Sequence, residues 1–292
     1  MEEIVIKNGH DGEIIDKLPK EEVEKGLYNF IDWATIRKSF SSNKNIILDG
    51  GTPSINKMPY PHLPTRNNEA VLIKSRGLSI VLLYEALQHY TKSCMYLLAG
   101  LTSWSNNFMM PGEVLMYYSK FFNIIGLTQL QMKSIMHIDG KTFRLSCIDS
   151  NDDLFLMKRQ DRGSPHKNWW YLFSKVFENS LETEYDYLWR DIRKDGFLDS
   201  GFRNTVNYSA DIANDEIHYA NDFLKDVLAV YRLPIFDEKF DWGEFGEIFP
   251  ETFLIVKHIH YFTDKIHQAV PCPPMDYKKF FFRQFCDFLK NV

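Results

Sequence analysis

Apolar and polar residues follow two different periods along the first 40 residues. Residues 2–15 hold two short apolar runs separated by the pairs Asn8-Gly9 and Asp11-Gly12, which favour tight turns. This pattern predicts a β-hairpin. Between residues 21 and 40, apolar side chains recur every three or four positions before a basic, Ser-rich stretch. The second pattern predicts a helix followed by a loop.

A proline-rich connector separates this start from the rest of the chain. Residues 49–65 contain four prolines, and proline interrupts helices and central strands because it has no backbone N–H. Residues 69–101 then carry the strongest helical pattern, and Pro111-Gly112 opens a second apolar helix that continues to about residue 125. We expect these two helices to pack as an antiparallel pair.

A period of two returns between residues 133 and 158. The pair Asp139-Gly140 separates two alternating runs, and a third apolar run follows an Asp/Asn-rich turn. This region therefore predicts an antiparallel meander. Ser164 followed by Pro165 is a typical helix start. Further helical patterns occupy residues 184–194, 215–231, 252–268 and 277–289.

Together these elements predict a mainly α-helical fold. We expect a helical bundle with a small antiparallel β-meander inserted at about residues 133–158 and a hairpin at the amino terminus. Residues 1–65 are expected to form an amino-terminal part of hairpin, helix and connector. Residues 66–292 are expected to form the helical domain that carries the insertion. A chain of 292 residues is long enough to bury a core without disulfides or metals.

Composition and charge narrow the class of protein. Apolar residues make up 45% of the chain and aromatic residues 15%, which predicts a folded protein. The net charge of −5 and the pI of about 6.0 exclude the overall basic character of proteins that coat nucleic acid, so any such contact must be local. The four cysteines form no C-x-x-C pair, and neither an apolar leader nor a run of about 18 apolar residues occurs. These features predict reduced thiols and a cytoplasmic protein without a membrane span.

One polar segment in the carboxy-terminal third is a candidate active site. Residues 202–209 read Phe-Arg-Asn-Thr-Val-Asn-Tyr-Ser, and Arg203, Asn204 and Tyr208 combine a permanent cation with two hydrogen-bonding side chains. The segment resembles the motif of the HEPN superfamily, in which an arginine and a polar residue, often asparagine, precede a histidine. Tyr208 stands where that histidine belongs. Paired aromatic residues at 117–118 and 121–122 resemble those of YaaC-like and other HEPN-related bacterial proteins.

The resemblance implies an endoribonuclease that needs no metal and no other cofactor. In this family the ribose 2′-hydroxyl attacks the adjacent phosphate, the site is usually completed in a homodimer, and the resemblance points to a toxin or anti-phage defence system. Arg203 would stabilise charge on the phosphate, and Tyr208, with an ordinary pKa of about 10, would donate a hydrogen bond or a proton. His166 is the candidate for the missing imidazole. A site that binds RNA without cutting it is the alternative.

A basic segment at residues 158–169 is a second candidate region. It combines closely spaced cations with an aromatic ring, a mixture suited to phosphate contact and base stacking. Its candidate RNA-binding residues are Lys158, Arg159, Arg162, Lys167 and Trp169. A plain solvated loop is the alternative interpretation.

Two other classes of function stay open at this point. The aromatic-rich helices suit an interaction module that binds a partner protein without catalysis, and the basic segment suits a regulatory module that senses a nucleotide. The histidines at positions 258, 260 and 267 share one predicted helix without metal-binding spacing, and the acidic clusters at 182–186 and 211–216 are typical of a solvated face. The sequence therefore predicts no metal site.

Overall fold

The structure is a computed structural model that describes residues 2–41, 54–106, 108–160, 163–178 and 250–271, together with single positions between 273 and 283. The chain divides into two compact units. Unit 1 takes in Met1–Gln88, Ile124–Trp189 and His267–Cys272. Unit 2 takes in His89–Asn123, Arg190–Ile266 and Pro273–Val292.

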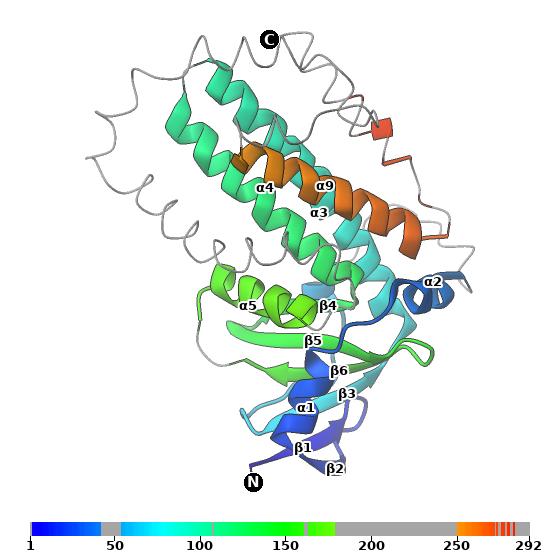
Figure 1. Ribbon diagram of the computed structural model, residues 1–292. Helices are drawn as coiled ribbons and strands as arrows, with labels where there is room; N and C mark the ends of the chain where they lie inside the picture. The colour runs from blue at the N-terminus through cyan, green and yellow to red at the C-terminus, as the bar shows by residue number, and fades with distance from the viewer. Residues whose placement is uncertain are drawn as a thin grey trace. The chain divides into compact units, whose positions relative to one another are not determined.

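Unit 1 is built on a six-stranded mixed sheet (Figure 1). The strand order is β2-β1-β3-β6-β5-β4, in which β1 and β3 are parallel neighbours and every other neighbouring pair is antiparallel. The carboxyl ends of β1 and β3 therefore lie at the same end of the sheet. The strands are β1 (Glu3–Asn8), β2 (Ile14–Pro19), β3 (Glu69–Lys74), β4 (Lys133–Ile138), β5 (Lys141–Asp149) and β6 (Leu154–Arg159).

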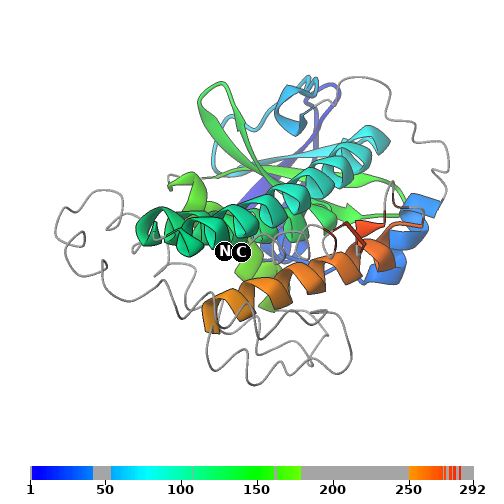
Figure 2. The same cartoon turned by 90° about the horizontal axis from the view of Figure 1, so that it is seen from above.

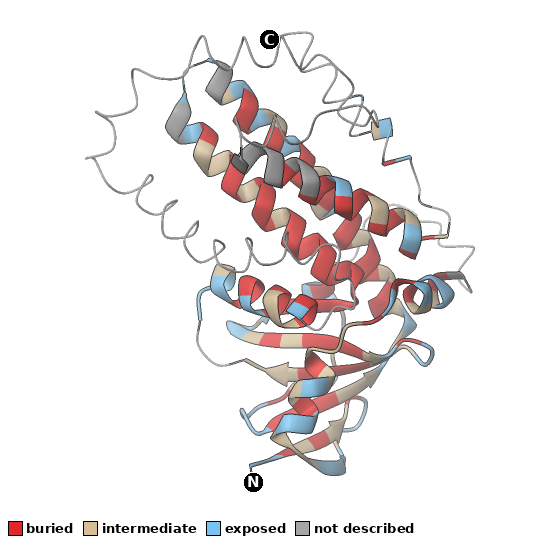
Figure 3. Ribbon diagram, viewed as in Figure 1, coloured by how far each residue is buried: buried red, intermediate tan, exposed pale blue. Residues whose placement is uncertain are grey.

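Residues on both faces of this sheet are buried. On one face, Val23 and Leu27 of α1 (Lys20–Leu27) pack with Ile4 of β1 in an apolar cluster. Val71, on the opposite face of β3, is fully buried as well. Figure 3 shows buried positions along the central strands, whereas β2 at the edge is intermediate or exposed along its length. Unit 1 also contains α2 (Trp33–Ser41), the short 3-10 helix η1 (Ile55–Lys57) and α5 (Pro165–Glu178).

The mainly α-helical fold expected from the sequence is wrong, because unit 1 is an α/β structure. The predicted meander forms as β4, β5 and β6, but β6 also pairs with β3, and β3 pairs with β1. The meander is therefore one half of a larger sheet and is not an insertion in a helical bundle. Residues 69–74, expected to begin a helix, form β3. Their apolar run shows no alternation because both faces of the strand are covered, and such a run cannot be told from a helix by its period.

Several local predictions are confirmed. β1 and β2 form the amino-terminal hairpin. Asp139 and Gly140 have positive φ angles of 50° and 71° between β4 and β5, as a two-residue hairpin turn of type I′ requires. α5 begins at Pro165, and the backbone N–H of Lys167 donates to Ser164 Oγ, as expected of a helix N-cap.

All described regular elements of unit 2 are helical. The Ser93 hydroxyl donates to the Ser119 carbonyl, and the Ser119 hydroxyl donates to the Ser93 carbonyl, both at 2.8 Å. Gly100 of α3 (Arg76–Ser105) lies against Gly112 of α4 (Met109–Leu130), so the two helices run antiparallel as predicted (Figures 1 and 2). A third helix, α9 (Pro250–Ala269), confirms the helix predicted at residues 252–268. The helices of unit 2 are parts of α3, α4 and α9.

Candidate functional site

The segment with the HEPN-like motif lies outside the part of the chain that the structure describes. The same holds for part of the basic segment and for two predicted helices, so their roles stay predictions. The undescribed candidates are Arg203, Asn204, Tyr208, Arg162 and the helices predicted at 184–194 and 215–231. The described candidates are Lys158, Arg159, His166, Lys167 and Trp169.

Lys158 and Arg159 do not form one basic surface. They are the last two residues of β6, and successive strand residues point to opposite faces of a sheet. Lys158 is paired in register with Arg144 of β5. Arg159 donates from Nη1 to the carbonyl oxygen of Thr65 at 2.6 Å. Arg159 therefore holds the chain that leads into β3.

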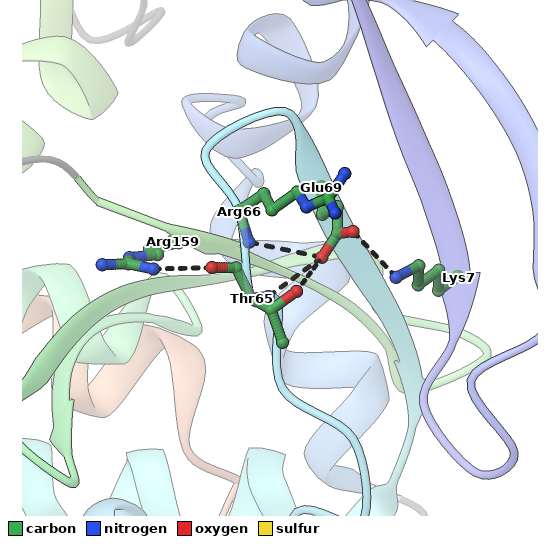
Figure 4. A network of polar contacts seen from close by, with 5 residues as sticks. All are labelled: Lys7, Thr65, Arg66, Glu69 and Arg159. Atoms are coloured by element: carbon green, nitrogen blue, oxygen red, sulfur yellow. Dashed lines mark hydrogen bonds and ion pairs between the residues drawn. The ribbon is translucent and has the colours of Figure 1, made fainter.

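Thr65 belongs to a polar network centred on Glu69, whose side chain is nearly buried (Figure 4). One carboxylate oxygen accepts from Lys7 Nζ at 2.9 Å, and the other accepts from Thr65 Oγ1 at 2.7 Å and from the Thr65 N–H at 3.0 Å. Burial by itself raises the pKa of Glu69, but the hydrogen bonds from Lys7 and Thr65 outweigh it and hold the pKa at about 2. The network is thus a fixed ion pair that joins β1, β3 and the preceding loop.

α5 carries the other described residues of the basic segment. Lys167 is exposed and His166 is partly exposed in the first turn of the helix. The ring of Trp169, a candidate for base stacking, is instead in the core, since Trp169 is 8% exposed and its neighbour Trp170 is 2% exposed. Burial of these rings corrects that part of the prediction. A nucleobase has no access to the face of Trp169 in this conformation.

A cluster around Arg144 in unit 1 was missed by sequence reasoning. The Arg144 guanidinium lies 4.7 Å from the ring centre of Tyr28 and 5.7 Å from that of Tyr171, and it donates to the Tyr28 hydroxyl. The two tyrosine rings meet edge to face at 5.9 Å. The cluster joins the end of α1, β5 and α5. No local pattern links these residues, because they come from three distant parts of the chain.

Unit 2 carries a row of four rings and one lysine along α3 and α4, which we call the aromatic–cationic stripe. It consists of His89, Lys92, Tyr96, Tyr118 and Phe122. The Phe122 ring stacks with His89 at 5.6 Å and with Tyr96 at 5.2 Å between ring centres. Lys92 Nζ lies 5.2 Å from the centre of the Phe122 ring, and the ring of Tyr118 lies 5.6 Å from that of Tyr96.

The stripe follows from helical spacing. His89, Lys92 and Tyr96 are three and four residues apart on α3, so they share one face of the helix, and Tyr118 and Phe122 are four apart on α4. Lys92 is exposed and the four rings are partly exposed. The surface therefore combines partly exposed rings with a positive charge, a mixture that complements planar bases and phosphates. The paired aromatics at 117–118 and 121–122 were its signal in the sequence.

Three other kinds of site or segment do not occur in the described ranges. Cys94 and Cys147 are buried, and burial raises the pKa of each thiol to about 12, so neither is a reactive thiolate near neutral pH. No group of three or more His, Cys, Asp or Glu side chains among the described residues is placed to hold a metal ion. No helix in the described part of the chain is long and apolar enough to cross a membrane.

Comparisons with known proteins identify no relative. No protein-family model, no curated protein and no solved structure matches the chain.

Proposed function

We propose that this protein binds RNA inside the cell, with the aromatic–cationic stripe of unit 2 as the RNA-binding surface. The observation that carries the proposal is the stack of His89, Phe122 and Tyr96 with Lys92 beside it. Nucleobases stack on such rings with about 1–3 kcal/mol per base, whatever the base, and a nearby ammonium group attracts the phosphate. The single-stranded form is favoured because its bases are free to stack.

The overall charge agrees with a local contact of this kind. A net charge of −5 gives no general attraction to RNA, so a few cations placed beside stacking rings must supply the binding. Lys92 is exposed at the centre of the stripe, and His89 lies one helical turn before it. We expect the affinity to depend only weakly on salt, because few phosphates are neutralised.

The proposed reaction centre is the segment with Arg203, Asn204 and Tyr208. The HEPN-like motif supports it, and we confine the proposed relationship to unit 2, whose described elements are all helical. In this proposal Arg203 stabilises charge on the phosphate and Tyr208 donates a hydrogen bond or a proton, without a metal ion. A homodimer completes the site. The buried, protonated thiols of Cys94 and Cys147 support an intracellular location.

Anisotropy of a short labelled single-stranded RNA tests the binding surface. Lys92→Glu and Tyr118→Ala should each weaken binding about 5- to 150-fold, the range that corresponds to about 1–3 kcal/mol. Tyr118→Phe keeps the ring and should bind as the unchanged protein does. Lys25→Glu alters an exposed lysine of α1 and is the matched charge control. RNA that fails to bind the unchanged protein at low salt contradicts the proposal.

Gel analysis of the same RNA in EDTA tests the reaction centre. The unchanged protein should cleave the RNA, and Arg203→Ala should abolish cleavage while binding persists. If the unchanged protein binds the RNA without cleaving it, the proposed enzymatic activity is contradicted and the proposed RNA binding is retained.

Binding of a partner protein by unit 2 is the second candidate function. Met95 and Phe108 of unit 2 are each 62% exposed, and large exposed apolar side chains are typical of protein contacts. Under this alternative, Met95→Ser should release a protein that co-purifies with the chain while RNA binding is absent from the start.

A further inference from the structure

Unit 1 contains a pocket of about 290 Å³ at the carboxyl ends of the parallel strands β1 and β3. Three segments form it: the turn after β1, the chain at residues 58–62, and the junction between β3 and α3. Ligands of α/β sheets usually bind in the crevice outside the carboxyl ends of the strands. The volume is near the lower end of the range for small-molecule pockets, which begins at about 300 Å³.

Two glycines allow the turn after β1 to form a wall of this pocket. A Cβ atom at Gly9 would lie 2.8 Å from the Leu72 carbonyl oxygen and 2.9 Å from Ile73 Cγ1, so only glycine lets the turn lie against β3. Gly12 has a φ angle of 77°, and a Cβ atom there would lie 3.0 Å from the His62 ring. The His62 ring therefore lies against the turn.

The floor of the pocket is apolar. Ile73 of β3 and Leu78 of α3 line it, and Leu78 is buried. Tyr60 forms a side wall, and its hydroxyl donates to the Ile55 carbonyl at 2.9 Å. Because that hydroxyl is already bonded, the tyrosine presents mainly its ring to a ligand. A flat ring compound fits such a floor and wall.

The rim of the pocket is basic and polar. His10, His62, Lys74 and Ser75 line it. Lys74 Nζ lies 3.7 Å from a carboxylate oxygen of Asp152, and both side chains are largely exposed, so an entering anion can compete for this lysine.

The carboxylate of Asp11, in the same turn as His10, is bonded within that turn. It accepts from the Glu13 N–H at 2.9 Å and from Asn8 Nδ2 at 3.2 Å. These bonds use both of its oxygens. Asp11 is also absent from the residues that line the pocket, so its carboxylate does not compete directly with a bound anion for the rim.

We propose that this pocket binds a small planar ring compound that carries one anionic group, the class to which nucleoside monophosphates belong. The ring lies on Ile73 beside Tyr60, and the anionic group meets His10, His62 and Lys74. The site lies wholly within unit 1, and the proposal does not depend on RNA binding by unit 2.

Isothermal titration calorimetry of the full chain tests the proposal with AMP, CMP and 4-hydroxybenzoate as probes. We expect at least one of these anions to bind. The matching neutral compound, adenosine, cytidine or phenol, should bind at least about tenfold more weakly because it lacks the anionic group. The double substitution His10→Gln and His62→Gln should weaken the anion by a similar factor.

Two control variants test whether the loss of anion binding is specific to the pocket. Lys141→Glu changes an exposed lysine at the start of β5, which does not line the pocket, and should leave binding unchanged. Lys92→Glu should impair RNA binding by unit 2 without affecting the small anion, so the two proposals can fail separately. Thermal melting confirms that the histidine variants fold. The proposal is overturned if none of the three anions binds, if the neutral compounds bind as tightly, or if the folded histidine variant binds unchanged.

Discussion

Two buried ionisable side chains in unit 1, Glu69 and Lys133, have opposite effects on stability. Glu69 keeps its charge because Lys7 and Thr65 bond to both of its oxygens. Lys133 is 0% exposed, and Nζ donates to the Gln131 carbonyl at 3.2 Å. Burial lowers the pKa of Lys133 from 10.5 to about 7. Burial of Lys133 therefore lowers the stability of the folded protein. The bonds to Glu69 instead stabilise the sheet at pH values above the pKa that Glu69 has in the unfolded chain.

Replacing Lys133 with methionine, Lys133→Met, should stabilise the protein at neutral pH. Methionine has a similar length and avoids the cost of burying an ammonium group. We expect a gain of more than about 1 kcal/mol near pH 7, since one unit of pKa shift corresponds to about 1.4 kcal/mol. In the unchanged protein, the unfolded lysine holds its proton up to pH 10.5 and the folded lysine only up to about 7. Stability therefore rises with pH across this window.

The advantage of Lys133→Met should accordingly shrink as the pH rises from about 7 toward 10.5. Urea unfolding at both ends of the window measures it as a difference between variant and unchanged protein. Lys141→Met, at an exposed position of β5, is the control for a general effect of removing a lysine. A loss of stability at both pH values would mean that the bond to Gln131 outweighs the cost of burial.

Single elements were predictable wherever the signal is local. The Asp139-Gly140 turn, the Ser164 cap and the hairpin at β1 and β2 follow from neighbouring residues, and all of them form. β3 was missed because Ala70-Val71-Leu72-Ile73 has neither a helical nor an alternating period. Its identity depends on pairing with β1 and β6, which lie far away in the sequence. Because the sequence does not reveal such long-range pairing, the mixed sheet could not be predicted and a helical bundle was expected instead.

The antiparallel packing of α3 and α4 in unit 2 depends on a glycine at their contact. A Cβ atom at Gly100 would lie 3.2 Å from the Gly112 carbonyl oxygen and 3.2 Å from Met116 Sδ. Gly100→Val should therefore force the helices apart and lower stability by about 1–3 kcal/mol, in spite of the small gain from removing a helical glycine. Urea unfolding followed by circular dichroism measures the effect.

Ala99→Val is the matched control for this substitution. Ala99 is the exposed neighbour of Gly100 on the same helix, so it tests the effect of valine on the helix without the close contact. We expect only a small change there. Equal losses in both variants would show that the contact with Gly112 is unimportant.

For the whole molecule, sequence reasoning found parts of the candidate surfaces and no complete one. Aromatic pairs on α4 were visible, but their contact with His89 and Lys92 depends on the antiparallel helix pair. His10, His62 and Lys74 of the pocket in unit 1 come from three separate segments. None of these segments carries a sequence motif that would predict a binding site. The basic segment failed as one surface because Lys158 and Arg159 lie on opposite faces of the sheet and Trp169 is in the core.

Acid should weaken the two units in different pH ranges. In unit 1, Glu69 contributes stability that is lost only as the pH falls below 4.5 toward about 2. In unit 2, burial, with a smaller effect from Lys120, lowers the pKa of His258 from 6.5 to about 3. Between these values the unfolded chain binds a proton at His258 that the folded chain does not. The contribution of His258 is therefore complete above pH 6.5 and is lost as the pH falls toward 3.

Removing this imidazole with His258→Leu should make unit 2 less sensitive to acid. The unchanged protein should lose about 2 kcal/mol between pH 6.5 and about pH 5, at about 1.4 kcal/mol for each pH unit, and the variant should be spared that loss. Thermal unfolding at several pH values measures it as a melting-temperature difference that grows in favour of the variant as the pH falls. Glu69 does not interfere in this range. His260→Leu, at an exposed position of the same helix, is the control for losing a histidine from that helix. Parallel curves for all three proteins would show that His258 titrates alike in the folded and unfolded chains.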